Sequence, residues 1–249
     1  MGLDFRLADH LPNRRKDRQP ADPAQLPRQR RGRTPQMHGR YPDYDVLEQA
    51  QHWDEVTRRM VLDRVHKVPS LRFFGAREAA TLSALCDELT AQDAEPRIPV
   101  LHYVDEKLHQ GSLDGYQYAD MPDDREVWRI VARGLDEQAQ RDGKAESFAV
   151  ADPRTRHEIV GRFAEGELDG GAWNQLNVKR AFSVVMRSVL SAFYSHPWAW
   201  NEIGFGGPAY PRGYSRFGSP HLQSAERESW EGAEAFDKDP VRQRQEPSP

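Results

Sequence analysis

Apolar residues recur at the spacing of a helix through most of the chain. A first stripe over 45–68 is followed by Pro69, and its spacing predicts an amphipathic helix. A second stripe predicts a helix over 76–91, and a third predicts one that begins near Pro99 and ends at Gly111. The stripes consist of Val46, Ala50, Trp53, Val56, Met60 and Val65, then Ala79, Leu82, Leu85, Cys86 and Leu89, then Val100, Tyr103, Val104 and Leu108.

Three more helical stripes follow in the second half of the chain. Asp123 or Asp124 can cap a helix that runs to about residue 142, Asp152-Pro153 is typical of a helix start, and a last stripe ends before Pro197. Almost no segment alternates with period two, so the sequence predicts an all-α fold. We expect a single bundle of about six helices. The apolar positions are Val127, Trp128, Ile130, Val131 and Leu135, then Ile159 and Phe163, then Val178, Phe182, Val185, Val189 and Phe193.

A long segment over 195–214 follows the last stripe and is rich in aromatic residues, Gly and Pro. Gly and Pro interrupt regular structure, so we expect this segment to be irregular and Pro197 to end the preceding helix. Its aromatic side chains must then be ordered by packing against the chain's own helices or against a second protein.

Charge and polarity divide the chain into three parts. Residues 1–45 hold ten Lys/Arg against six Asp, a formal charge of +4, so the rest, with 25 Lys/Arg against 33 Asp/Glu, carries −8. We expect a disordered basic arm rich in Pro and Arg over 1–44, a helical domain over 45–218, and a disordered polar tail over 219–249. A basic arm could contact an acidic patch, an anionic surface or nucleic acid, or remain a solvated tail.

Cysteine usage and apolar runs limit the redox chemistry and the compartment. The chain has one cysteine, which allows no intrachain disulfide and cannot hold an iron–sulfur cluster. Arg14-Arg15 precedes a polar stretch broken by proline, so no export signal is predicted, and the most apolar run, 181–194, is too short to span a bilayer. We therefore expect a cytoplasmic protein, or one exported only with a partner that bears a signal.

Candidate catalytic and metal-binding groups lack the spacing that their chemistry needs. His102 and His109 are two helical turns apart, roughly 10 Å, which is too far for one ion without other ligands. No His-Glu-x-x-His, Gly-x-Ser-x-Gly or strand-to-helix Gly-x-Gly-x-x-Gly motif occurs. Adjacent carboxylates would point to different helix faces, as surface or cap residues; these pairs are Asp87-Glu88, Asp105-Glu106 and Asp123-Asp124. We predict no catalytic, cofactor-binding or metal-binding residue in this chain.

Two segments carry a resemblance to a known family. The run from Phe193 to Pro208, which reads Phe-Tyr-Ser-His-Pro-Trp-Ala-Trp-Asn-Glu-Ile-Gly-Phe-Gly-Gly-Pro, resembles the C-terminal signature of the gluconate 2-dehydrogenase subunit 3 family. Residues 73–89, followed by 98–108, are similar to an upstream part of that family. The resemblance implies a small, non-catalytic partner of a large flavin-dependent dehydrogenase of the glucose-methanol-choline type. FAD would then belong to that large subunit, and a cytochrome c subunit is a further candidate partner in the same complex.

The candidate partner interface follows from the aromatic C-terminal segment. Trp, Tyr and Arg dominate interface energetics, and Arg212 lies between two tyrosines. The same side chains have a structural alternative, because His196 near a helix end can simply pack there and both tryptophans can be core residues. The predicted interface residues are Phe193, Tyr194, His196, Trp198, Trp200, Asn201, Phe205, Tyr210, Arg212 and Tyr214.

Two function hypotheses follow. The first is an accessory subunit that binds and stabilises or matures a large dehydrogenase acting on a sugar, sugar acid or glycoside. The alternative is a stand-alone helical binding module whose basic arm contacts nucleic acid or an anionic surface. The acidic body disfavours nucleic acid as a partner, because such proteins usually gather Lys and Arg on a folded face.

Overall fold

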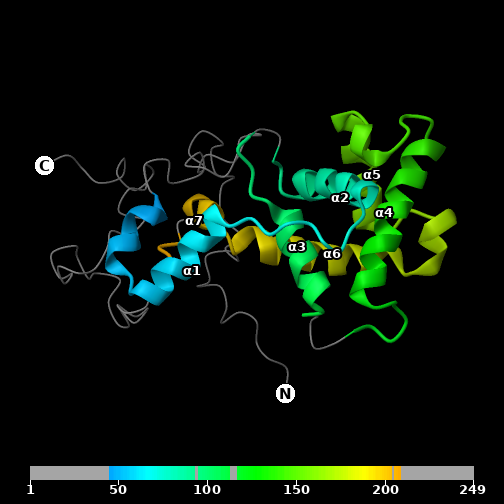
Figure 1. Cartoon of the computed structure of the whole chain (residues 1–249). Helices are drawn as coiled ribbons and strands as arrows, with labels where there is room; N and C mark the ends of the chain where they lie inside the picture. The colour runs from blue at the N-terminus through cyan, green and yellow to red at the C-terminus, as the bar shows by residue number, and fades with distance from the viewer. Residues whose placement is uncertain (1–44, 93–94, 113–116, 204, 209–249) are drawn as a thin grey trace, which may run out of the picture.

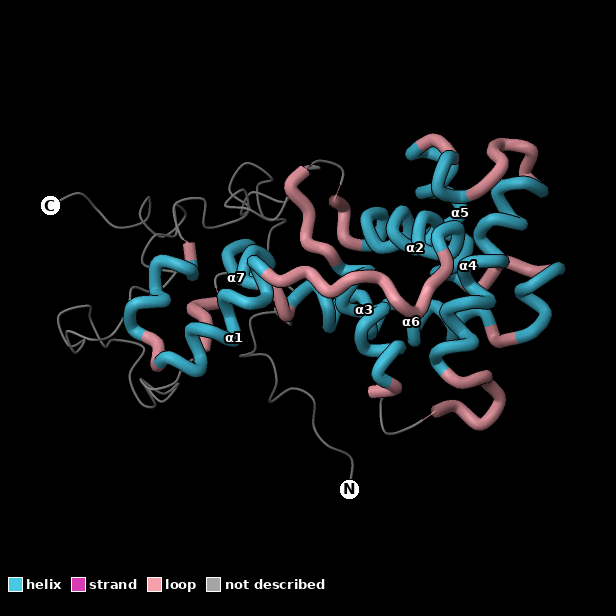
Figure 2. The backbone as a smooth tube through the Cα atoms, viewed as in Figure 1, coloured by secondary structure: helices cyan, strands magenta, loops and turns pink. Residues whose placement is uncertain are grey.

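The computed structural model describes residues 45–92, 95–112, 117–203 and 205–208. Within these ranges the backbone forms seven α-helices, three short 3-10 helices and no strand, which confirms the predicted all-α fold (Figure 2). The predicted arm over 1–44, the predicted tail over 219–249 and the domain end at 218 lie outside the described residues. In chain order the elements are η2 (Val46–His52), α1 (Glu55–His66), α2 (Ala76–Leu89), α3 (Val100–Gln110), α4 (Asp124–Arg141), η3 (Phe148–Val150), α5 (Pro153–Glu165), η4 (Gly171–Gln175), α6 (Val178–Tyr194) and α7 (Pro197–Ile203).

The elements form two groups with separate apolar clusters. Helices α2 to α6, with η3 and η4, build the larger group, which we call the bundle. Elements η2, α1 and α7 build the smaller group, which we call the cap, around Val46, Trp53, Val61 and Trp200. Figure 1 shows the cap at one end of the molecule, with α6 leading from the bundle into α7.

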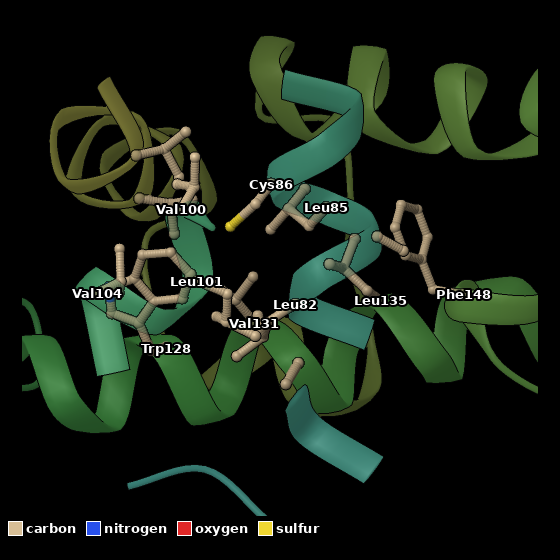
Figure 3. Packing of buried hydrophobic residues seen from close by; sticks show 14 of the residues in the cluster. Leu82, Leu85, Cys86, Val100, Leu101, Val104, Trp128, Val131, Leu135 and Phe148 are labelled. Carbon is tan, nitrogen blue, oxygen red and sulfur yellow. The ribbon is translucent and has the colours of Figure 1, made fainter. Parts of the chain in front are cut away.

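The bundle is centred on α2, which touches α3, α4, α5 and α6. Figure 3 shows Leu82, Leu85 and Cys86 of α2 directed into this core together with Val104 of α3 and Trp128 of α4. Each of these five side chains is at most 2% exposed. The predicted apolar faces of the bundle helices therefore meet in this core. They come from the stripes over 76–91, 99–111, 123–142, 153–163 and 178–193.

A glycine inside α4 permits one close contact of the bundle. A Cβ atom at Gly134 would lie 2.6 Å from the indole ring of Trp173 on η4, closer than such atoms approach. Glycine lowers helix stability by about 1 kcal/mol relative to alanine. Here it lets a fully buried tryptophan lie against the helix backbone.

The single helix predicted over 45–68 is wrong. The structure divides it into the 3-10 helix η2 and helix α1, with a break at Trp53-Asp54. The Asp54 carboxylate accepts hydrogen bonds from two backbone N–H groups in the first turn of α1, and this cap starts a new helix. As a result Val56 and Met60, which the stripe predicted to be buried, are 56% and 59% exposed.

The irregular structure predicted directly after α6 is also wrong in part. Pro197 begins a seventh α-helix, α7, because proline is compatible with the first helical turn, where no N–H partner is needed. Residues 205–208 have no regular secondary structure, as expected, and 209–214 lie outside the described residues.

The α1–α2 connection, residues 67–75, is held against α3 by one buried carboxylate. Asp105 is 0% exposed and accepts hydrogen bonds from the backbone N–H groups of Arg72, Phe73 and Phe74, at 2.7, 3.0 and 2.9 Å. The prediction that Asp105 is a surface or cap residue is therefore wrong. Its charge is stabilised by three backbone donors in the interior, and it fixes the connection that joins cap and bundle.

Candidate partner interface

The corner between α6 and α7 is built by short-range hydrogen bonds. Ser195 ends α6, and its hydroxyl donates to the carbonyl of Ala192 at 2.7 Å. The next residue, His196, starts α7: the backbone N–H of Trp198 donates to its Nδ1 at 3.2 Å, and the N–H of Ala199 donates to its carbonyl. His196 thus acts as an N-terminal cap, the role that Ser or Asp usually fills.

His196 is a neutral, buried imidazole. It is 1% exposed, and its ring lies 4.7 Å from that of Trp198 and 6.5 Å from that of Tyr103 on α3. Burial lowers the pKa of His196 to about 4; a hydrogen bond to the Arg64 backbone opposes this shift, and the positive Arg64 side chain adds to it. His196 therefore packs inside the fold, which was the alternative to a partner contact. Its ring caps α7, however, and does not bond the last carbonyls of α6.

Arg64 joins α1 to the same corner. Its Nη1 donates to the carbonyl of Ser195 at 2.8 Å, and its guanidinium lies 5.9 Å from the centre of the Trp200 ring. Its own carbonyl accepts from the hydroxyl of Tyr103. The Trp200 indole N–H donates to the carbonyl of Tyr194 at 2.7 Å. Polar contacts therefore connect cap and bundle at this junction, and Ala199 and Trp198 of α7 add apolar contacts to the cluster of the bundle.

Asn201 and Gly207 complete the packing of the cap. Asn201 Oδ1 accepts from the N–H of Val46 at 2.8 Å, and its Nδ2 donates to Asp45 at 3.1 Å. Gly207 has a φ of +81°, and a Cβ there would lie 2.9 Å from Val46 and 3.0 Å from Trp53. The glycine run after α7 thus lets the chain pass closely over η2.

The ten predicted interface residues fall into three groups. Phe193, His196, Trp200 and Asn201 are buried against the chain's own helices, so in this conformation they shape the corner without contributing surface. Tyr194 is 45% exposed, and Trp198 and Phe205 are partly exposed. Tyr210, Arg212 and Tyr214 lie outside the described residues. That the exposed members contact a partner stays a prediction.

One apolar surface residue lies next to this set and was not predicted. Ile203, the last residue of α7, is 54% exposed. A helical interpretation of 197–203 would have drawn attention to it, but the Gly- and Pro-rich composition masked the short helix. We call the exposed and partly exposed residues Tyr194, Trp198, Ile203 and Phe205 the corner surface.

A cavity elsewhere, between α2 and α5, contains several charged groups that are already paired. It has a volume of about 410 Å³. Arg97 forms an ion pair with Asp87, and the ring Nδ1 of His157 lies within hydrogen-bond distance of the Glu88 carboxylate, at 2.8 Å. Burial raises the pKa of Asp87, while the Arg97 charge acts against that shift.

In the part of the chain that the structure describes, no three His, Cys, Asp or Glu side chains are grouped as a metal site would need. None of the described helices has the length and apolar character of a bilayer-spanning segment.

One known family matches the part of the chain that contains the bundle and α7. A family model described as gluconate 2-dehydrogenase subunit 3 matches residues 76–207, from the start of α2 to Gly207. The chain belongs to this family. The family name implies an accessory subunit of a multi-subunit gluconate dehydrogenase complex. The matched region contains the whole bundle and α7, and it begins after η2 and α1. No curated protein and no solved structure matches the chain.

Proposed function

We propose that this chain is a non-catalytic small subunit that binds a large FAD-dependent dehydrogenase of the glucose-methanol-choline type and stabilises or matures it. The large subunit would hold FAD and oxidise a sugar, sugar acid or glycoside. The observation that carries the proposal is the family match, which extends over every helix of the bundle and α7.

The corner surface is the proposed docking site. Tyr194 lies edge-on against buried Phe193, with ring centres 5.1 Å apart, and Trp198 lies against buried His196. Because buried residues hold these rings, ordering them on binding would cost little conformational entropy. Exposed apolar and aromatic side chains beside a rigid corner are the type of anchor that dominates interface energetics.

Co-expression with the flavin-dependent large subunit of the same organism tests the proposal. The tagged chain should co-purify with a yellow partner that shows flavin absorbance. The double variant Tyr194→Ala/Ile203→Ala should reduce the recovered flavin, whereas Val150→Ala, which removes a 69% exposed apolar side chain from η3, should not. A colourless lone chain, with the large subunit soluble and active without it, would contradict the proposal. Salt-sensitive retention of that lone chain on heparin would then favour the binding-module alternative.

The stabilising role has a separate readout. A subunit that binds only the folded partner stabilises it by about 2.7 kcal/mol at a concentration 100 times the Kd. The flavin fluorescence of the large subunit should therefore report a melting temperature that rises with added chain. A complex that forms without any such rise would restrict the role to maturation.

A further inference from the structure

A second surface of the bundle presents arginine side chains stacked on an aromatic ring. The guanidinium of Arg129 lies 4.4 Å from the centre of the Phe73 ring, and that of Arg125 lies 5.3 Å from it. We call these three residues the arginine stack. It lines a cavity of about 360 Å³ on the side of the bundle, together with Arg72, Asp123 and Glu126.

The ring beneath the two guanidiniums is held firmly. Asp105 binds the backbone N–H of Phe73 and those of both neighbouring residues. The Phe73 ring lies edge-on against buried Phe74 at 4.9 Å, and Phe74 lies against Trp128 at 6.1 Å. Phe73 is thus a fixed platform, and stacking on it orients the guanidiniums before any ligand arrives.

Hydrogen-bond donors of the stack remain available. Arg129 makes no hydrogen bond or ion pair with the residues that the structure describes. Arg125 uses its Nε–H on the carbonyl of Leu108 at 3.0 Å, so its terminal nitrogens are left over. The nearby carboxylates have other partners, since Asp123 caps α4 and Glu126 pairs with Arg133 at 3.2 Å.

This arrangement does not serve the stability of α4. Arg125 and Arg129 are four residues apart on one helix face, and like charges at that spacing destabilise a helix. Arg125 also lies in the first turn, where the helix dipole disfavours a positive charge. An incoming negative group would relieve both effects, and the same dipole would attract it.

We propose that the arginine stack binds a carboxylate side chain on an acidic segment of a protein partner. Guanidinium groups match carboxylates in charge and in their paired donor geometry. A cavity of this size accepts a side chain but not a nucleic-acid duplex. That the partner is the large dehydrogenase subunit rests on the proposed function.

Binding of a hexaglutamate peptide to the full chain alone gives the first test. Fluorescence anisotropy should show binding that weakens from about 0.05 M to about 0.3 M NaCl. The variant Arg125→Gln/Arg129→Gln should weaken it about tenfold. Arg154→Gln, which removes one exposed, paired arginine from α5, is the control and should leave it unchanged. An unchanged affinity in the double variant overturns the proposal. So does inorganic phosphate that competes as well as the peptide, or a short DNA duplex that binds the stack more tightly.

The complex with the large subunit separates this inference from the proposed function. If the wild-type chain captures the large subunit, the double variant should release it at a lower salt concentration than the Arg154→Gln control does. Capture with an unchanged salt dependence overturns the role of the stack while the proposed function stands. Peptide binding that depends on the stack, without any capture of the large subunit, supports the carboxylate site and contradicts the proposed function.

Discussion

The bundle and the cap are held together by different forces. The bundle encloses large apolar side chains such as Trp128, Leu82 and Phe163, each fully buried among several helices. Among the described residues, the separate apolar cluster of the cap has four buried members, and polar contacts through Arg64 and Asn201 add to it. Stability from burial grows with the apolar area removed from water, so the bundle supplies most of the folding free energy. The cap should open locally at a lower free energy.

The family match follows the same division. It covers the bundle and α7 but begins after η2 and α1, so the two elements that cover α7 lie outside it. The corner surface lies where the two regions meet. Experiments that perturb bundle, junction and cap in turn will show whether the regions differ in stability as their packing indicates.

The largest effect is expected from the bundle core. Trp128→Ala removes a 0% exposed side chain and should lower the free energy of unfolding by about 3–5 kcal/mol. Denaturant unfolding followed by circular dichroism measures this loss. Trp200→Ala, at the 5% exposed tryptophan of the cap, is the matched comparison and should cost clearly less. Equal losses at the two sites would mean that bundle and cap unfold as one unit.

A smaller effect is expected from protonation at the junction. The pKa of His196 is about 4 in the folded chain against an ordinary value of 6.5, so the unfolded state binds the proton more readily. The contribution of the neutral imidazole to the free energy of unfolding is therefore fully present above about pH 6.5 and falls as the pH decreases. The loss amounts to about 3 kcal/mol by pH 4.

His196→Asn isolates this contribution, because the amide oxygen can still accept the N–H of Trp198 but does not titrate in this range. The free energy of unfolding, measured from pH 7 to pH 4, should fall more steeply in the wild type than in the variant. Parallel pH profiles would show that the imidazole is accessible to protons in the folded chain.

The smallest effect is expected within the cap. Asn201→Ala leaves the buried N–H of Val46 without its acceptor, which should cost about 1–2 kcal/mol. Hydrogen exchange should become faster in η2 and α1 and stay unchanged in α2 and α4. Asn174→Ala removes a comparable acceptor for Gly170 on an exposed part of the bundle and serves as the control. Faster exchange throughout the bundle would contradict the division into two regions.

The sequence predicted much of the bundle because its signals are local. Asp123 and Asp152 cap helices as their positions indicated, and Gly111 ends α3 in a left-handed conformation with a φ of +68°. Around the cap the same rules gave wrong results. Asp54 divided the first stripe into two elements, and Pro197 started a helix that it was expected to prevent.

The candidate site was predicted only in part. The sequence located the aromatic segment and its family resemblance, but it could not tell buried Trp200 from partly exposed Trp198, since both follow Pro197 closely. Trp200 is buried because η2 and α1, from the other end of the described chain, contact α7, as the hydrogen bond between Val46 and Asn201 shows. Trp198 instead packs against the cluster of the bundle and stays partly exposed.

Local patterns were enough to predict the all-α class, the apolar faces of the bundle helices and the family, because periodicity, caps and motif residues are properties of neighbouring positions. Tertiary contacts, by contrast, set which aromatic residues remain at the surface, bury Asp105 under three backbone N–H groups, and stack Arg125 and Arg129 on Phe73. These features arise from contacts between segments far apart in the chain, whose free energy no local pattern encodes.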